Sequence, residues 1–320
     1  MKIAILFPGQ GSQNVGMGID LYESNKTAKE IFNQVNSILG RKITDIFLYG
    51  PQEELNQTKN TQPAIVTVSV ALTLILEKEL KSKNLKLTPS ACTGHSLGEF
   101  TALWYSNILN LDELIKLVSL RGSLMQNATS GSMAAVLNLE EETIKKIIEE
   151  SKTNVVIANF NSPSQLVISG KKDEISAVVD RIKLTAGKAI ILPVSGAFHS
   201  TLMDESSKTF NQDIDKLNIF SNKSAKIPIY QNYDGKPETS IEIIKGKIKK
   251  QMTSPVYWTQ TIKNLVNDGV DTVIEIGPGK ILTGLTKKID KSITCYNIYD
   301  FKTLSDFIIS HEHKLSTIKP

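Results

Sequence analysis

The order of the elements predicted between residues 132 and 194 limits the fold more than any other feature of the sequence. Short apolar runs typical of strands alternate there with two longer segments typical of helices, the first of which begins with three glutamates. The elements are strands at 132–139, 154–160, 165–170 and 188–194, and helices at 140–151 and 172–187, the second closing on Gly187. This β-α-β-β-α-β order predicts a small ferredoxin-like unit.

The segments on both sides of this unit also contain strands and helices. Before it we expect a buried strand at Ile3–Phe7, a buried helix at 63–80 that begins at Pro63, and an amphipathic helix at 111–127. After it we expect strands at 228–232 and 272–277 and helices at 240–252 and 259–268. The predicted fold is therefore α/β. Residues 1–130 and 195–320 form a large α/β-hydrolase-like subdomain with a parallel sheet, and residues 131–194 are an inserted ferredoxin-like subdomain.

Composition excludes several classes of function. Lysine and arginine number 37 against 33 aspartates and glutamates, and this excess of +4 is spread along the chain, whereas nucleic-acid binding favours a basic stripe. Two cysteines exclude a disulfide framework and a cysteine-rich metal site. No apolar run reaches the ~20 residues that span a bilayer, and the N-terminus is typical of a first strand. We expect a cytoplasmic protein with no metal, cofactor, nucleic acid or membrane partner.

The stretch Gly94-His95-Ser96-Leu97-Gly98 is a G-x-S-x-G sequence between a predicted strand at 89–93 and a predicted helix at 99–105. In that context the glycines allow a tight turn that exposes the serine hydroxyl as a nucleophile. The following helix start directs its amides toward developing negative charge, and Leu97 supplies the nearest amide. The alternative is a glycine-rich turn whose serine only caps the helix. The strand–turn–helix context favours a nucleophilic Ser96.

A general base for Ser96 can be sought among four histidines. His95 should project away from its neighbour on a sharp turn, and His311 and His313 fall in a polar tail. His199 remains, 103 residues after Ser96, at the end of the predicted small unit. The alternative is a structural histidine at a junction between subdomains.

No acidic residue is placed to complete a triad. Asp204 and Glu205 follow His199 closely but belong to the next predicted helix. A dyad remains possible in which a backbone carbonyl or side-chain amide fixes the histidine ring and its tautomer.

Two further features have both a functional and a structural explanation. The loop FPGQGSQ at 7–13 contains two glycines, so its backbone can approach a ligand and donate an amide to an oxyanion; otherwise it is a turn in which Ser12 caps a helix. Arg121 lies in a mostly apolar predicted helix, where a buried guanidinium needs an anionic partner. That partner is either a substrate carboxylate or an internal acid, unless the side chain extends to the surface.

Eight short motifs together resemble the malonyl-CoA:acyl-carrier-protein transacylase family, which shares its fold with the acyltransferase domains of polyketide and animal fatty acid synthases. The resemblance covers roughly residues 1 to 290. The motifs are FPGQGSQ at 7–13, TQPA at 61–64, GHSLGE at 94–99, RG at 121–122, ANFNSPSQLVISG at 158–170, GAFHS at 196–200, SPVYW at 254–258 and EIGPGKILTGL at 275–285.

The resemblance implies a role for each matching residue. Ser96 would carry the acyl group and His199 would act as general base and then general acid. The backbone amides of Gln10 and Leu97 would form the oxyanion hole, and Arg121 would bind the free carboxylate of malonyl. The Gln251 carbonyl would orient the histidine in place of an aspartate. Phe198 would leave little room for an α-methyl branch, which favours malonyl by ~1–3 kcal/mol at most.

The implied reaction is a ping-pong transfer of malonyl from malonyl-CoA to the phosphopantetheine thiol of holo-acyl carrier protein, which supplies fatty acid synthesis. Three alternatives stay open: a discrete acyltransferase serving a polyketide synthase in trans, a serine thioesterase or hydrolase that releases free acid, and a non-enzymatic carrier-binding module. Carrier proteins are acidic, so the lysine-rich run at 245–250 is either a docking surface or an ordinary solvated helix face.

Overall fold

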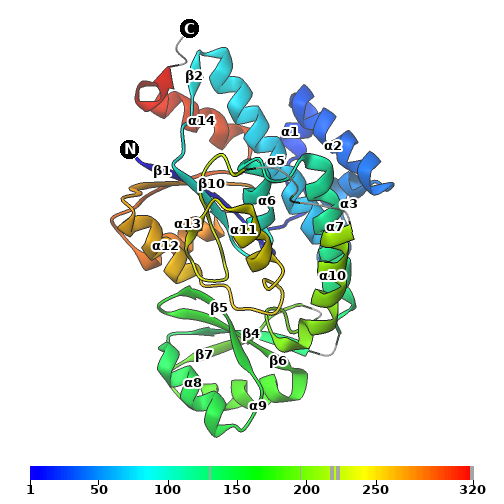
Figure 1. Ribbon diagram of the computed structural model, residues 1–320, viewed down its shortest axis with the longest axis vertical. Helices are drawn as coiled ribbons and strands as arrows, with labels where there is room; N and C mark the ends of the chain where they lie inside the picture. The colour runs from blue at the N-terminus through cyan, green and yellow to red at the C-terminus, as the bar shows by residue number, and fades with distance from the viewer. Residues whose placement is uncertain (130, 195, 217–219, 221–223, 318–320) are drawn as a thin grey trace.

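A computed structural model describes residues 1–129, 131–194, 196–216, 220 and 224–317, and its strands form two main sheets (Figure 1). The larger has the strand order β11-β10-β1-β3-β8-β9, and the smaller has the order β5-β6-β4-β7. A short pair, β12 and β2, joins the end of the described chain to residues 85–86. The strands are β1 Ile3–Phe7, β2 Leu85–Lys86, β3 Ala91–Gly94, β4 Gly131–Leu137, β5 Val156–Ser162, β6 Gln165–Lys171, β7 Lys188–Ile191, β8 Ile229–Tyr230, β9 Pro237–Glu238, β10 Thr272–Ile276, β11 Thr294–Ile298 and β12 Ser316–Thr317.

The six-stranded sheet is parallel except for its edge strand β9. Its central strand β1 pairs with β10 on one side and β3 on the other, and all five of its residues are buried. Parallel strands covered on both faces are apolar along their whole length, as the IAILF run predicts. The parallel arrangement expected for the larger part of the chain is confirmed, with β9 as the exception.

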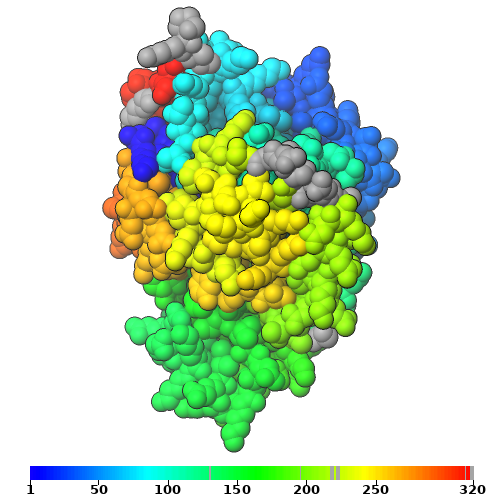
Figure 2. All heavy atoms as spheres, viewed as in Figure 1, coloured from blue at the N-terminus to red at the C-terminus, as the bar shows by residue number. Residues whose placement is uncertain are grey.

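The four-stranded sheet is antiparallel and contains the elements β4, α8, β5, β6, α9 and β7 in chain order. Helices α8 (Glu141–Glu150) and α9 (Lys172–Lys183) lie on the side away from the larger sheet (Figure 1). Their buried isoleucines and valines form a separate core with Ala134, Val136 and Ile168 of the sheet. Figure 2 shows this unit, in green, as a lobe at the lower end of the molecule.

Helix α9 ends four residues before the predicted stop at Gly187. The side chain of Thr185 explains the early end. Its hydroxyl donates to the carbonyl of Ile182 and accepts from the amide of Gly187. A side chain therefore provides hydrogen bonds that a further helical turn would otherwise provide. Strand β7 likewise ends at Ile191, short of the predicted 194.

Helices cover both faces of the larger sheet, and most predicted helices are confirmed within a few residues. Helix α7 has the predicted bounds. The helices of this part are α1 Ile19–Ser24, α2 Lys26–Leu39, α3 Ile43–Tyr49, α4 Gln52–Leu55, α5 Thr58–Ser82, α6 Gly98–Tyr105, α7 Leu111–Asn127, α10 Asp204–Lys216, α11 Ile241–Ile248, α12 Trp258–Asn267, α13 Ile281–Ile289 and α14 Phe301–His311, with short 3-10 turns η1 Thr201–Met203 and η2 Glu312–Lys314. None of the helices within the described ranges is long and apolar enough to cross a membrane.

The predicted start of the buried helix at Pro63 is wrong, because α5 begins at Thr58 and contains this proline. Proline lacks the N–H that would bond to the carbonyl four residues earlier. That carbonyl, on Lys59, instead accepts a hydrogen bond from the Arg41 guanidinium at 3.0 Å. A side chain from a neighbouring segment therefore satisfies the group that proline leaves unpaired, and the helix extends past it.

The assignment of His311 to a polar tail is also wrong. His311 ends helix α14, and only 6% of its surface is exposed. Its ring stacks on Phe307 and meets Tyr296 edge-on, and its Nδ1 lies 2.9 Å from the Phe307 carbonyl oxygen. The apolar residues Leu304, Phe307 and Ile308 recur at helical spacing and mark the buried face of this helix, on which His311 also lies.

A buried carboxylate joins β10 to α13 and generates a prediction about stability. The two oxygens of Glu275 accept the backbone amides of Leu282 and Thr283 at 3.0 and 2.7 Å. Glu275→Gln should lower the free energy of unfolding by about 1–3 kcal/mol, because its NH₂ would face one of these N–H groups. Urea unfolding measures the change, with the exposed Glu149→Gln as control. Equal midpoints for the two variants would contradict the prediction.

Candidate active site

Ser96 lies at a sharp turn between β3 and α6, with its backbone in the left-handed region at φ 48°. A residue with a side chain seldom takes this conformation unless surrounding structure holds it there. A Cβ on Gly94 would lie 2.0 Å from the carbonyl carbon of Gly98, and one on Gly98 would lie 2.0 Å from the carbonyl oxygen of Phe7. The predicted strand–turn–helix is confirmed. Ser96 does not cap α6, which has no side-chain cap.

A side-chain amide that sequence reasoning missed holds this turn. The Oδ1 atom of Asn232, two residues beyond β8, accepts the backbone N–H of Ser96 at 2.6 Å. Its Nδ2 donates to the carbonyl of Gly94 at 2.7 Å. Asn232 thus fixes the backbone on both sides of His95. In the sequence, Asn232 is marked only by its position at the end of the predicted strand 228–232. That position does not identify a contact with Ser96.

The structure brings His199 to Ser96. Its Nε2 lies 2.8 Å from the Ser96 hydroxyl oxygen, and its Nδ1 lies 2.9 and 3.0 Å from the carbonyl oxygens of Gln251 and Ser254. Carbonyl oxygens only accept hydrogen bonds, so Nδ1 carries the proton and Nε2 presents a lone pair to the serine. Two carbonyls therefore occupy the position of a triad carboxylate. Gln251 was expected there and Ser254 was not.

The environment of His199 keeps the ring neutral. Burial, together with the nearby Arg121 charge, lowers the pKa of His199 to about 3. A base must be unprotonated to accept a proton, and this ring meets that condition throughout the neutral range. Asp204 and Glu205 lie on α10, as predicted, and none of the hydrogen bonds among described residues joins either to His199.

Arg121 is buried beside both residues, with 1% of its surface exposed. One guanidinium nitrogen donates to the Ser96 hydroxyl at 3.1 Å and to the side-chain oxygen of Gln251 at 2.9 Å. The carbon of the guanidinium lies 5.2 Å from the ring centre of Phe100, and the Nε of Arg121 has no hydrogen-bond partner within the described part of the chain. Burial lowers the pKa of Arg121 to about 9, so the group is still charged at neutral pH. Among described residues no carboxylate forms an ion pair with it, so the alternative of an internal acid in contact with Arg121 is not supported.

The glycine loop after β1 lies directly against the serine turn. A Cβ on Gly9 would lie 2.4 Å from the carbonyl oxygen of His95. The amide N–H groups of Gln10 and Leu97 donate no hydrogen bond to any described residue. The Ser12 hydroxyl donates to the Gly9 carbonyl, and the next helix begins only at Ile19, so Ser12 is not a helix cap.

A cavity of about 110 Å³ opens beside Ser96, between the two main sheets. One side is polar and contains Ser96, His199 and Arg121. The other side is apolar and includes Phe198. The lining residues are Gln10, His95, Ser96, Arg121, Met125, Met133, Asn159, Leu192, Val194, Phe198 and His199. The ring of His95 bonds to Asn161 at 2.7 Å and not to the serine hydroxyl. The small volume suits a short acyl group with a polar end.

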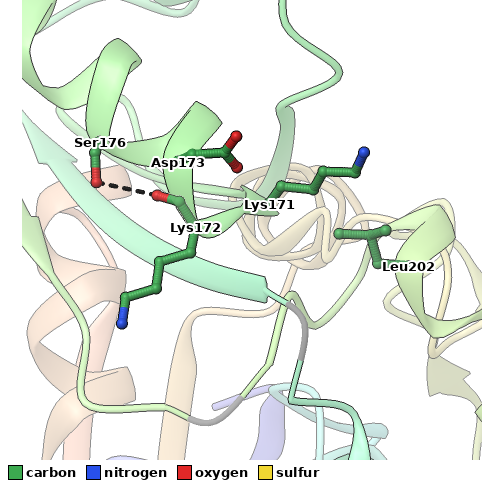
Figure 3. A pocket seen from close by; sticks show the side chains of 5 residues that line it. All are labelled: Lys171, Lys172, Asp173, Ser176 and Leu202. Atoms are coloured by element: carbon green, nitrogen blue, oxygen red, sulfur yellow. Dashed lines mark hydrogen bonds between the residues drawn. The ribbon is translucent and has the colours of Figure 1, made fainter.

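A larger hollow of about 470 Å³ lies between the start of α9 and η1 and carries no comparable chemistry. Figure 3 shows its residues, with the side chains of Lys171 and Lys172 extending in different directions. The hydroxyl of Ser176 donates to the Lys172 carbonyl within the helix. Ser176 is thus used in local structure, whereas Ser96 faces the His199 imidazole and the Arg121 guanidinium.

The comparisons with known proteins agree with this geometry. The acyl transferase domain family matches residues 5–300. The malonyl CoA-acyl carrier protein transacylase of Bacillus subtilis (strain 168) is 38% identical over 310 residues, which is 95% of each chain. The chain belongs to the malonyl-CoA:acyl-carrier-protein transacylase family. The Staphylococcus aureus (strain MRSA252) member is 39% identical over 312 residues, covering 95% of this chain and 97% of that one.

Solved structures of family members share the fold. The acyl carrier protein S-malonyltransferase of Vibrio cholerae is 37% identical with a TM-score of 0.88, over 96% of this chain and all of that one (100%). A malonyl transacylase in complex with a type II polyketide synthase acyl carrier protein is 34% identical with a TM-score of 0.90, over 97% of this chain and 100% of that one. The chain is therefore an acyltransferase with the mixed α/β fold of this family.

The tight contact at Gly98 leaves no room for a side chain. Gly98→Ala should abolish acylation of Ser96 and destabilise the protein, because the new methyl overlaps the Phe7 carbonyl in the centre of the sheet. Gly284→Ala is the matched control, since a Cβ there has open space within a helix and should be neutral or slightly stabilising. Thermal unfolding and acyl-enzyme mass measure both variants. An active, stable Gly98→Ala protein would contradict the steric argument.

Proposed function

We propose that this protein transfers the malonyl group from malonyl-CoA to the phosphopantetheine thiol of acyl carrier protein, through a malonyl ester of Ser96. The observation that carries the proposal is the buried Arg121 guanidinium, which contacts no carboxylate of the described residues and lies 3.1 Å from the Ser96 hydroxyl. A buried charge of this kind is matched by a carboxylate on the acyl group. The names of the relatives support the same acyl group and the same acceptor.

Acylation of the serine follows from the geometry of the pair. The Ser96 oxygen attacks the thioester carbonyl of malonyl-CoA while Nε2 of His199 takes the hydroxyl proton. The free amides of Gln10 and Leu97 stabilise the negative oxygen of the tetrahedral intermediate. The C–S bond then breaks, the CoA sulfur leaves with the proton from His199, and malonyl-Ser96 remains. The carrier thiol reverses these steps and regenerates the serine.

Gln251 and Ser254 orient the base in this proposal, and Phe198 shapes the acyl site. The two carbonyls hold the imidazole by its Nδ1 proton, so no aspartate is needed. Phe198 and the neighbouring methionines limit the width of the cavity, which disfavours an α-methyl branch.

We also propose that the two main sheets belong to two subdomains. The smaller sheet, with its strand order β5-β6-β4-β7 and its two helices on one face, supports an inserted ferredoxin-like subdomain at 131–194. Residues 1–130 and 195–320 would form the α/β-hydrolase-like subdomain around the larger sheet. The boundary residues 130 and 195 and the last three residues, 318–320, lie outside the described part of the chain.

The pathway we propose is fatty acid synthesis in the cytoplasm, with a polyketide synthase as the alternative that one structural relative supports. The lysine-rich run at 245–250 is a weak candidate for carrier docking. Lys245 and Lys249 lie 2.8 and 2.5 Å from Asp215, and Lys247 lies 2.9 Å from Asp234. Two aspartates of the same chain therefore offset half of the positive charge of the four lysines in this run.

Ser96→Ala tests the covalent intermediate. The variant should lose the mass increase of one malonyl group after incubation with malonyl-CoA, since no nucleophile remains. Intact-protein mass spectrometry measures the adduct, and holo-acyl carrier protein in the same assay reports transfer. Rapid release of free malonate without malonylated carrier would identify a hydrolase instead. A Ser96→Ala protein that still functions would favour a carrier-binding module.

Arg121→Ala tests recognition of the acyl carboxylate. Malonyl loading should fall at least about 30-fold, because the carboxylate would enter a buried site without its cation. Acetyl loading, which needs no cation, should fall less or rise. Competition between malonyl-CoA and acetyl-CoA measures the ratio directly. An unchanged ratio would refute the role of Arg121 in selectivity.

A further inference from the structure

We infer that Glu99 is a positioning residue that sets the Arg121 guanidinium beside Ser96 through the side chain of Gln251. The inference rests on the proposed role of Arg121 in binding the acyl carboxylate. Glu99 lies in the first turn of α6, three residues after the nucleophile, and 1% of its surface is exposed. It does not face the cavity beside Ser96, and the proposed reaction steps do not use it.

Both oxygens of Glu99 are occupied. One accepts the backbone N–H of Asn232 at 3.1 Å, and the other accepts the side-chain NH₂ of Gln251 at 2.7 Å. The same NH₂ donates to the Ser96 carbonyl at 2.9 Å. The oxygen of the Gln251 amide then accepts from Arg121 at 2.9 Å. A continuous chain of hydrogen bonds therefore runs from Glu99 through Gln251 to Arg121.

The direction of this chain is fixed by the chemistry of its ends. An ionised carboxylate can only accept hydrogen bonds, and a guanidinium can only donate them. The amide between them must therefore turn its NH₂ toward Glu99 and its oxygen toward Arg121. Without the carboxylate, the reversed amide would place its NH₂ against the guanidinium, donor against donor. The Ser96 carbonyl accepts the same NH₂, so Glu99 and this carbonyl together determine which face of Gln251 meets Arg121.

The position of the charge matters as much as its sign. A carboxylate in direct contact with Arg121 would neutralise it and also occupy the donors that the substrate needs. Glu99 acts from one amide away, so it offsets the buried positive charge and leaves the Nε of Arg121 without a partner. The guanidinium is held in place and remains free to bind an acyl carboxylate.

The pH dependence of malonyl loading provides a readout that a purely structural role would not change. Burial raises the pKa of Glu99 to about 7, although the bonds from Gln251 and Asn232 oppose this shift. Among the described residues, Arg121 is the charged group that acts on Glu99, and amides supply the other contacts of this carboxylate. Because the carboxylate is ionised above its pKa, its positioning effect should weaken as the pH falls below about 7. His199, with its pKa of about 3, does not titrate in this range.

Glu99→Gln is the first test, with wild type measured in parallel between about pH 5 and 8. The variant should show KM for malonyl-CoA raised roughly tenfold, with a smaller change for acetyl-CoA, since the charge-assisted bond that orients Gln251 toward the cation is lost. Wild type should lose malonyl loading relative to acetyl loading below about pH 7, and the variant should not. If Glu99→Gln fails to fold, the pH profiles of malonyl and acetyl loading by wild type provide the test. Profiles of equal shape for the two acyl groups would overturn the inference.

Glu275→Gln is the matched control, because Glu275 is also a buried glutamate that accepts two amides but lies away from Arg121. It should lower stability and leave the ratio of malonyl to acetyl loading within about twofold of wild type. The same shift of the ratio in both variants would mean a general effect of losing a buried carboxylate and would overturn the inference.

A double-mutant cycle separates this inference from the proposed function. In an Arg121→Ala background, adding Glu99→Gln should change malonyl loading by less than about twofold, because the residue through which Glu99 acts is absent. Full additivity of the two substitutions would overturn the inference. If Arg121→Ala alone leaves selectivity unchanged, the proposed function of Arg121 fails. If Arg121→Ala changes selectivity and Glu99→Gln does not, only the role of Glu99 fails.

Discussion

The contact between Gly98 and the carbonyl of Phe7 is the constraint on which the rest of the site depends. It brings the start of α6 against the end of the central strand β1, closer than any side chain would allow. The chain must then reverse within three residues, which holds Ser96 in the left-handed region with its hydroxyl toward His199. The same approach lays the Gly9–Gln10 loop against the turn, where the backbone N–H groups of Gln10 and Leu97 donate to no described residue.

The site is held by segments that are far apart in the sequence, and each contributes a group that the others leave unsatisfied. Asn232 accepts the Ser96 amide, Glu99 accepts the Asn232 amide, and Gln251 connects Glu99 to Arg121. Gln251 also orients His199 with its backbone carbonyl. One glutamine therefore contributes its side chain to the cation and its main chain to the base. This coupling ties the Arg121 guanidinium and the Ser96–His199 pair to one short segment after α11.

Sequence reasoning found the parts of the site that local patterns encode. A G-x-S-x-G sequence marks Ser96, and four histidines leave few choices for its partner. It missed Asn232 and Ser254, since their contacts arise only when separate loops meet, and a carbonyl can belong to any residue. Glu99 belongs to the GHSLGE motif, but the motif alone assigns it no contact. The wrong start at Pro63 has the same cause, because the Arg41 contact that lets α5 pass through a proline is tertiary. His311 differs: the apolar spacing of α14 was present in the sequence.

Among the described residues no carboxylate contacts His199, which is consistent with the same electrostatics. The site holds a positive charge, Arg121, within hydrogen-bonding distance of the nucleophile. A carboxylate behind His199 would attract that guanidinium and compete with an acyl carboxylate for it. Carbonyl oxygens orient the imidazole without adding a charge, and burial beside Arg121 keeps it neutral. The negative charge needed to offset Arg121 is held instead by Glu99, behind an amide, where it stabilises the cation without occupying it.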